Sequence, residues 1–469
     1  MNELTIHLAP HSGTPLYEQI YRYIKENIRT SRISCGEKLP STRALCSHLE
    51  VSRSTVEMAY EQLLSEGYIE AVPYRGYFVA EVEELWHLEP APARDEKKRE
   101  EKKPSFRYRF DFTPNGVDLN SFPYNIWRKL SREVLLDDRT ELFRLGEPQG
   151  EYEFRRAICS YLYQARGVNC SPRQVVVGAG SDYLLMLLCS LLGRDHVIAV
   201  ENPTYMQAYR LFRSQSYRVC PIRMDRRGMD TRLLEESGAD IAYVTPSHQY
   251  PTGIVMPIRR RMELLAWAEA KRGRYIVEDD YDSEFRYKGK PIPALQGYDA
   301  RGKVIYLGTF SKSIAPAIRL SYMVLPEVLC VEYERKLGFI NSTVSKVDQL
   351  IMCRFLEEGY YERHLNKTRS LYRGRHDQLI AGLKPLADTC RISGENAGVH
   401  LLLHFDDGRT ERELIEKAAA RGIRVYGMSD YIVGEPGREA VILLGYANMP
   451  EERIKEACDI LCGIWKRDV

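Results

Sequence analysis

The sequence has no run of eighteen apolar residues, and its first stretch, MNELTIHLAPHSG, lacks the basic and then apolar layout of a signal peptide. These absences predict a cytoplasmic protein that does not use a membrane. The eleven cysteines are scattered and none falls in a C-x-x-C pair, so we interpret them as reduced core thiols without a metal or disulfide role. The formal net charge of +2 excludes a generally basic surface. Nucleic-acid binding would therefore need a local patch.

What the chain does have is the composition of an ordinary globular protein, with a length that suits two or three domains. Of its 469 residues, 44% are hydrophobic and 28% are charged. Changes in composition divide the chain into residues 1–80, a linker at residues 81–109, and residues 110–469. The linker is mixed in charge, contains proline and is poor in aliphatic residues, which is typical of a flexible connection.

Residues 14–79 predict three short helices followed by a hairpin. Apolar residues recur every fourth position in LYEQIYRYIKENI, which places them on one face of a first helix. A second helix begins after Ser41, with Ala44 and Leu45 directed inward, and Ser52 is the expected N-cap of a third. Two strand-like runs, YIEAV and GYFVAEV, flank a short turn. This order of elements predicts a winged helix-turn-helix.

Polar and basic side chains gather where the third helix begins, the part of a recognition helix that meets base edges and phosphates. An arginine on the second helix and another at the hairpin tip are placed to join them. Residues 1–80 hold eight Lys and Arg against nine Asp and Glu, which favours a directed site over general binding. The alternative is a solvated face without a partner. The candidate DNA contacts are Arg43, Ser52, Arg53, Ser54, Thr55 and Arg75.

Three elements of this segment occur in order and at matching spacing: L-P-S-x-R, V-S-R-x-T-V and A-Y-x-x-L-x-x-E-G-Y. With the RGYFV wing, they resemble the GntR-type winged helix of bacterial transcription regulators over nearly all of residues 14–79. The resemblance implies a domain that binds double-stranded operator DNA as one half of a dimer. It places the family's DNA-contact positions at Arg43, Arg53, Ser54, Thr55, Arg75 and Gly76.

From Phe110 onward, β-rich apolar runs alternate with helical stretches. The runs are VVVG, HVIAVEN, YRVCPI, IAYVT, YIVEDD, VIYLGTF and LSYMVL. Such alternation predicts a mostly parallel sheet covered by helices on both faces.

Lys312 follows the predicted buried strand VIYLGTF, in the stretch GTFSKSIAPAIR. A lysine at the end of a buried strand is costly unless its charge is paired or it forms a covalent bond. A Schiff base with a carbonyl cofactor would remove that cost. Pyridoxal 5'-phosphate (PLP) is such a cofactor, and it also needs a phosphate cradle, a carboxylate for the pyridinium nitrogen, a donor for the phenolic oxygen and an aromatic face for the ring.

Each of these needs has a candidate in the sequence. Hydroxyls and a guanidinium that suit phosphate surround the lysine at Thr309, Ser311 and Arg319. The backbone of Gly180, Ser181 and Asp182 follows a strand and opens an apolar helix, where N–H groups can bind the same phosphate. The remaining candidates are Asp279 or Asp280 for the nitrogen, Tyr281 for the phenolic oxygen and Tyr205 for stacking. Singly, a strand-end aspartate is more often a helix cap and a tyrosine more often core.

Residues 110–469 resemble a fold-type I aminotransferase, on the motifs GEPQGEYEFRRAICSYLYQARGV, VVVGAGSDYLLMLL, ENPTY, TPSHQYPTG, IVEDDYDSEF and GTFSKSIAPAIRLSYMVLP. Behind a GntR-like winged helix, this arrangement resembles the MocR/GabR family of regulators. The resemblance implies a large PLP domain with a smaller C-terminal α+β domain, dimeric across the active site. It assigns Lys312 to the aldimine, Asp279 to the pyridinium nitrogen and Tyr281 to the phenolic oxygen. Ring stacking falls to Tyr205, and phosphate binding to Ser181, Thr309, Ser311 and Arg319.

Four departures from the aminotransferase pattern bear on whether the chain is an enzyme or a sensor. Leu443 stands where aminotransferases usually carry an arginine that binds the substrate carboxylate, and Tyr250 stands where they carry an asparagine beside the ring. The ring is then expected to be held with help from His248. Ala317 replaces a common glycine. Asp430 stands where regulators that sense γ-aminobutyrate have an arginine, which disfavours that effector, although Arg210 or Arg424 could supply a displaced carboxylate contact.

These observations predict a PLP-dependent transcription regulator whose aminotransferase-like domain senses an amine, an amino acid or PLP itself through the aldimine at Lys312. Ligand binding would be transmitted through the linker to a pair of DNA-binding domains. The main alternative is a true PLP-dependent aminotransferase with a DNA-binding appendage. A third possibility is a DNA-binding scaffold with an empty PLP fold, which the intact set of cofactor residues disfavours.

Overall fold

The computed structural model describes residues 6–9, 13–81, 108–136, 140–287, 292–435, 437 and 439–466. The chain forms two compact units, residues 1–105 and residues 106–469. Nearly all of the predicted linker, from residue 82 to residue 107, lies outside the described residues. Within the described part of the chain, the helices are all too short or too polar to cross a lipid bilayer.

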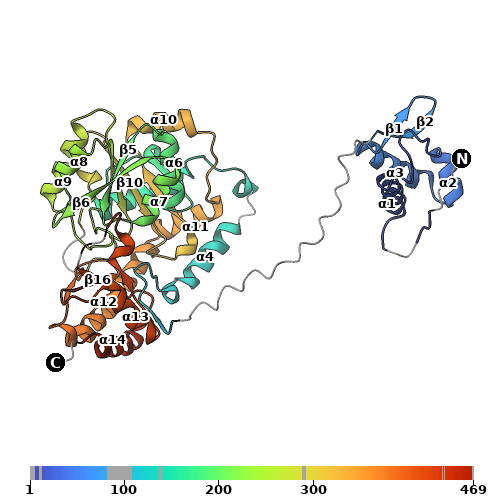
Figure 1. The fold of residues 1–469 in the computed structure, drawn as a ribbon. Helices are drawn as coiled ribbons and strands as arrows, with labels where there is room; N and C mark the ends of the chain where they lie inside the picture. The colour runs from blue at the N-terminus through green and yellow to red at the C-terminus, as the bar shows by residue number, and fades with distance from the viewer. Residues whose placement is uncertain are drawn as a thin grey trace. The chain divides into compact units, whose positions relative to one another are not determined.

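The first unit is a three-helix domain with a β-hairpin, as predicted (Figure 1). Its elements are α1 Leu16–Arg29, α2 Thr42–Leu49, α3 Arg53–Ser65, β1 Ile69–Val72 and β2 Gly76–Val79. Ile20, Ile24 and Ile28 of α1 are buried against α3, because their fourfold spacing puts them on one face. Ala44 was expected to point inward but is exposed, since Leu45, one position further around α2, takes the buried place.

The second unit is built on an eight-stranded sheet. Its strands are β4 Val175–Gly178, β5 Val197–Asn202, β6 Arg218–Asp225, β7 Gly228–Met229, β8 Ile241–Val244, β9 Tyr275–Asp280, β10 Val304–Thr309 and β11 Ser321–Val324. The strand order is β4-β11-β10-β9-β8-β5-β6-β7. Strands β10, β9, β8, β5 and β6 run parallel, whereas β11 and β7 are antiparallel to their neighbours. The predicted mostly parallel sheet is confirmed.

Helices cover both faces of this sheet (Figure 1). Val176 of β4 packs into the core beneath α6, α7 and α10, whereas its neighbours Val175 and Val177 pack into the core beneath α4, α5 and α11. Successive strand residues face opposite sides, so both faces need apolar residues, which explains the unbroken runs in the sequence. The helices are α4 Tyr124–Leu135, α5 Tyr152–Arg166, α6 Ser181–Leu192, α7 Met206–Ser214, α8 Thr231–Glu236, α9 Ile258–Glu269, α10 Glu327–Leu337 and α11 Lys346–Glu357.

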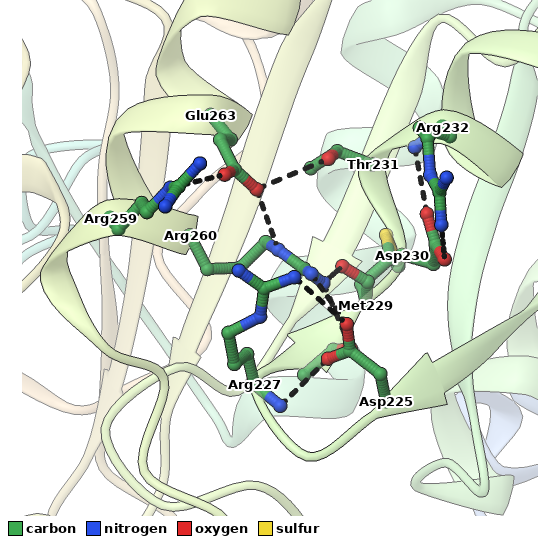
Figure 2. A network of polar contacts seen from close by, with 10 residues as sticks. Asp225, Arg227, Met229, Asp230, Thr231, Arg232, Arg259, Arg260 and Glu263 are labelled. Atoms are coloured by element: carbon green, nitrogen blue, oxygen red, sulfur yellow. Dashed lines mark hydrogen bonds and ion pairs between the residues drawn. The ribbon is translucent and has the colours of Figure 1, made fainter.

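A buried arginine of α9 forms hydrogen bonds and an ion pair with the β6–β7 edge of the sheet (Figure 2). Arg260 of α9 donates from Nη2 to Asp225 Oδ2 at 2.7 Å and from Nε to Glu263 Oε2 at 2.8 Å. It also donates to the backbone carbonyls of Gly228 and Met229 in the β6–β7 turn. A guanidinium with carboxylate and carbonyl partners on all sides can be buried without an unpaired charge. This network is structural, since these partners of Arg260 all belong to the β6–β7 edge and to α9.

The C-terminal part of the second unit forms a smaller α+β layer. Its four-stranded antiparallel sheet has the order β12-β13-β16-β15. The elements are α12 Tyr360–Leu383, β12 Arg391–Ser393, β13 His400–Phe405, α13 Glu411–Ala420, β14 Ile423–Arg424, β15 Tyr426–Gly427, β16 Ala440–Gly445 and α14 Glu451–Trp465. The short strand β3 Phe110–Asp111 pairs with β14, and Phe110 is buried in the same core. Residues from Phe110 onward are therefore part of this unit.

Candidate functional site

Residues that are far apart in the sequence converge on one cavity of about 320 Å³ at the carboxyl ends of the parallel strands. Nine of the eleven predicted cofactor residues line it: Ser181, Asp182, Tyr205, Asp279, Tyr281, Thr309, Ser311, Lys312 and Arg319. The other two, Gly180 and His248, lie directly behind residues of this wall. The cavity also takes in Asn115, Gln207, Thr245, Tyr250 and Pro316. Ligand sites of open α/β sheets are expected at this edge.

Lys312 lies just past the end of β10 and reaches into the cavity. Its Nζ donates to Asn115 Oδ1 at 2.9 Å. Burial lowers the pKa of Lys312 to about 8, and the negative charge of Asp282 opposes this shift. A lysine with a lowered pKa carries more of the neutral amine, which is the nucleophilic form. The environment of Lys312 therefore suits bond formation with a carbonyl carbon.

The two adjacent aspartates of β9 have different roles, because neighbouring strand residues point to opposite faces. Asp280 accepts from Arg166 Nε at 2.8 Å and from the Tyr306 hydroxyl at 2.5 Å. Its carboxylate is thus bound to buried side chains of the protein core. Asp279 lines the cavity and accepts from the Tyr243 hydroxyl. Burial raises the pKa of Asp279 to about 6, and the hydrogen bond from Tyr243 opposes the shift. Asp279 is the carboxylate available to a bound cation.

Tyr281 is backed by a buried histidine and carboxylate. The Tyr281 hydroxyl lies 2.9 Å from His248 Nδ1, which is also 2.9 Å from Asp282 Oδ2. His248 does not line the cavity and reaches it only through Tyr281. The expected help from His248 in holding a bound ring would therefore be indirect, because the histidine fixes the position of the tyrosine hydroxyl.

The part of the cavity wall near the start of α6 has the features of an anion site. Gly180 precedes α6 at φ +95°, and a Cβ there would lie 2.0 Å from Arg319 Nη2, so only glycine lets the guanidinium approach the helix end. Backbone N–H groups at the start of α6 favour an anion. Ser311 Oγ is buried and has no hydrogen-bond partner among the described residues. A phosphate bound between Ser311, Arg319 and α6 would satisfy these groups.

Aromatic rings form a wall of the cavity. The rings of Tyr205 and Tyr250 meet edge to face at 5.7 Å, and Tyr250 also meets Tyr281 at 5.4 Å. The Tyr250 hydroxyl donates to the hydroxyl of Tyr431, at 3.3 Å, from the smaller layer. Tyr205 presents a ring face suited to a flat ligand. Tyr250, which replaces the usual asparagine, links this wall to the smaller layer.

The positions that were expected to govern carboxylate binding lie elsewhere. Leu443 is fully buried in β16 and packs with Leu402 and Met428, so its side chain does not reach the cavity. Asp430 is exposed and does not line the cavity. Arg424 Nη1 lies 3.6 Å from Asp111 Oδ2, and neither Arg424 nor Arg210 lines the cavity. None of these four residues is part of the wall of the Lys312 cavity.

In the first unit, the predicted DNA contacts divide into structural and available side chains. The Ser52 hydroxyl accepts from Thr55 N at 3.2 Å and caps α3, so it has a structural role. Arg53 is exposed and pairs with Glu57 one turn along α3, at 2.7 Å. Gly76 has φ +107° at the start of β2, which favours glycine for backbone reasons. Exposed positions on this unit include Arg43, Ser54 and Arg75.

Several residues of the site were not foreseen from the sequence, and three of them contact predicted site residues directly. Asn115 belongs to a loop almost two hundred positions before Lys312, Tyr243 lies in the neighbouring strand β8, and Asp282 follows Tyr281 by one. Neither Asn115 nor Tyr243 belongs to a sequence motif that indicates a role in the site. The run EDDYD did contain Asp282, and its spacing of three from Asp279 was the available signal.

Comparison with known proteins identifies both units. Residues 16–79 match the gntR family of bacterial regulatory proteins, and residues 116–461 match the class I and II aminotransferases. The chain belongs to the MocR/GabR family of transcription regulators. The expected pairing of a winged helix with a fold-type I aminotransferase domain is thereby confirmed.

The relatives of this family match along nearly the whole chain. The chain is 40% identical to the uncharacterized HTH-type transcriptional regulator YdeL of Bacillus subtilis, over 96% of this chain and 97% of that protein. It is 30% identical to the HTH-type pyridoxine biosynthesis transcriptional regulator PdxR of Corynebacterium glutamicum, over 97% and 96%. A crystal structure of a multiple substrate aminotransferase from Thermococcus profundus covers 76% of this chain and 91% of its own, at 27% identity and a TM-score of 0.68.

Proposed function

We propose that this protein is a DNA-binding transcription regulator that holds PLP on Lys312 and uses it to sense an amino compound or PLP itself. The observation that carries this proposal is the convergence of Lys312, Asp279, Tyr281 and an anion cradle on one cavity, in a chain that also has a gntR-type unit. PLP supplies an aldehyde that forms an imine with a primary amine. Lys312 provides such an amine, and a ligand amine that replaced it would free the lysine side chain.

The residues present fit PLP at each of its polar groups. The carboxylate of Asp279 would pair with the pyridinium nitrogen, and the Tyr281 hydroxyl, positioned by His248, would donate to the phenolic oxygen. Tyr205 would lie against the ring. The phosphate would occupy the cradle formed by Gly180, Ser181, Asp182, Thr309, Ser311 and Arg319. There its oxygens would accept hydrogen bonds from the unpartnered Ser311 hydroxyl and from the backbone N–H groups at the start of α6.

A sensor is favoured over an aminotransferase by the residues around the cofactor position. Arg319 is the one guanidinium among the residues that line the described cavity, and it belongs to the anion cradle. A second cation for the carboxylate of an amino-acid substrate is therefore missing from this wall. Stable turnover of amino acids would need such a contact to orient the substrate. Binding without turnover needs only a difference in affinity between two arrangements of the protein.

The class of effector follows from the same cavity. Because a carboxylate partner is missing, a simple γ-amino acid is disfavoured, while an amine with a second polar group, or PLP itself, fits the donors and acceptors present. The relative PdxR of Corynebacterium glutamicum is named as a regulator of pyridoxine biosynthesis, which supports PLP as a candidate effector. We propose further that two copies of the chain act together on operator DNA in the cytoplasm. Arg43, Arg53, Ser54, Thr55 and Arg75 would contact the DNA.

Spectroscopy of purified protein supplied with PLP tests this proposal. The full chain should show the absorbance of a protonated imine, and Lys312→Ala should lose it while keeping its fold by circular dichroism. Incubation with amino acids and a keto acid should yield at most a single turnover. An unchanged imine spectrum in Lys312→Ala would refute the assignment of the lysine, and sustained keto-acid production would favour the aminotransferase alternative.

A further inference from the structure

The second unit has another cavity that is larger than the one at Lys312. It has a volume of about 880 Å³ and lies between α5, the loop after β9 and the start of α12. Its wall shares no residue with the wall of the Lys312 cavity. The volume is in the range of ordinary small-molecule sites. The proposed function leaves this cavity without a role.

One wall of this cavity carries a carboxylate that is only half satisfied. Glu284 Oε1 accepts from the Tyr161 hydroxyl at 3.1 Å and from the Tyr361 hydroxyl at 3.5 Å. Glu284 Oε2 is buried and has no hydrogen-bond partner among the described residues. A buried carboxylate oxygen without a donor costs free energy, and such oxygens are uncommon in native proteins. A ligand that brought a cationic N–H donor would remove this cost.

Two arginines of the same wall have guanidinium N–H groups that are not bound to other described residues. Within the described part of the chain, the Arg286 side chain forms no hydrogen bond or ion pair, and its Nε is buried without a partner. Arg369 donates from Nε to Glu284 O at 2.6 Å and from Nη1 to Asn366 Oδ1 at 3.0 Å, which leaves Nη2 for a ligand. Free guanidinium donors are suited to a carboxylate.

The other arginines of this cavity are already committed to the protein. Arg156 pairs with Glu153 and Glu357, and Arg166 pairs with the buried Asp280. The unpaired groups are thus a carboxylate oxygen at Glu284 and guanidinium donors at Arg286 and Arg369.

We propose that this cavity is a second, non-covalent site for a small zwitterion of the amino-acid class. The ligand's carboxylate binds Arg286 and Arg369, and its ammonium group binds Glu284 Oε2. The two tyrosines that hold Glu284 form the adjoining wall. A site of this kind recognises an amino acid by paired opposite charges and does not need PLP.

The contacts around this cavity lead directly to the residues next to the proposed cofactor. The Tyr361 hydroxyl, which contacts Glu284, also lies 2.9 Å from the hydroxyl of Ser313, the residue that follows Lys312. Arg166, on the same wall, holds Asp280, the neighbour of Asp279. A ligand in this second site can therefore affect the cofactor site, because the contacts reach Ser313 and Asp280, which are the chain neighbours of Lys312 and Asp279.

Calorimetric titration of the full PLP-loaded chain with N,N-dimethylglycine tests the proposal. This compound keeps a carboxylate and a protonated N–H donor, but as a tertiary amine it cannot form an imine. We expect it to bind at least about tenfold more tightly than acetate or dimethylammonium, which each carry one of its two charges. Binding should persist in Lys312→Ala, which separates this site from the proposed cofactor function.

Glu284→Gln and Arg286→Gln should each weaken this binding by about tenfold, which corresponds to about 1.4 kcal/mol. Arg301→Gln is the matched control, because Arg301 is exposed and lines a different cavity of about 580 Å³. Arg286 is only partly buried, so its variant should fold even if Glu284→Gln proves unstable. Unchanged affinity in a folded Arg286→Gln protein, or no preference for the zwitterion over acetate, would overturn the proposal.

Discussion

At the scale of single residues, Lys312 owes its chemistry to its surroundings. Burial lowers its pKa from 10.5 to about 8, while the carboxylate of Asp282 acts in the opposite direction. The hydrogen bond to Asn115 orients Nζ across the cavity. A lysine in this setting reaches its neutral, nucleophilic form more than two pH units earlier than an exposed one. The rate at which Lys312 forms an imine with PLP should therefore depend on pH around this lowered pKa.

We therefore expect the rate of imine formation by PLP-free protein to rise with pH, with a midpoint near 8 and not near 10.5. Stopped-flow absorbance at constant ionic strength measures this profile. Asp282→Asn should move the midpoint to lower pH, because it removes a charge that stabilises the protonated lysine. A midpoint near 10.5, or a shift to higher pH in Asp282→Asn, would contradict the assigned environment.

The same scale shows what the sequence could and could not predict about the site. The residue types and order predicted Lys312, Tyr205 and the phosphate cradle, because these needs are met by short motifs. The choice between Asp279 and Asp280 depends on which face of β9 each one occupies, and the partners Tyr243 and Arg166 that distinguish them come from other elements. Spacing along one strand contains no information about those partners.

At the scale of elements, the start of α3 combines a structural serine with an exposed arginine. The Ser52 hydroxyl caps the helix by accepting from Thr55 N. Ser52→Ala should destabilise the first unit by about 1 kcal/mol, measured as a lower midpoint of its thermal or urea unfolding transition in the full chain. Ser47→Ala is the control, since Ser47 is exposed inside α2, where alanine is the better helix former. Equal losses in both variants would argue against capping.

Arg53, one position further along, should act on DNA and not on stability. It is exposed, and its ion pair with Glu57 is of a surface kind that contributes little, so the guanidinium is free to exchange Glu57 for a phosphate or base. Arg53→Ala should weaken specific operator binding by about tenfold or more, measured by fluorescence anisotropy at fixed salt. Arg22→Ala removes the same charge from α1 and should have a much smaller effect. Comparable losses in the two variants would mean that binding is diffuse.

Element boundaries followed well from the sequence where the burial pattern was strong, as in the fourfold apolar repeat of α1 and the continuous buried run of β9. The prediction failed where two adjacent residues competed for one buried position, as with Ala44 and Leu45. The sequence also did not show that Leu443 is buried in the core of the smaller layer or that Asp430 is exposed. Burial depends on how β16 packs on its neighbours, which a local pattern does not specify.

At the scale of the whole molecule, the two units should be separable. Phe110 and Phe112 are buried in the core of the second unit, and β3 pairs with β14, so a truncation has to begin before them. A chain that starts at Phe106 should bind PLP as the full chain does and should form the proposed dimer, measured by absorbance and by analytical ultracentrifugation. Loss of PLP binding from a folded truncation would mean that the first unit contributes to the cofactor site.

The most direct test of the central claim, that chemistry at Lys312 controls the DNA-binding unit, is a DNase I footprint of the PLP-loaded full chain on the DNA upstream of its own gene. An amine that changes the imine absorbance should also change the footprint of the wild-type chain, and it should leave the footprint of Lys312→Ala unchanged. Identical wild-type footprints with and without such an amine would contradict the claim, because the ligand would then occupy the site without any effect on DNA binding.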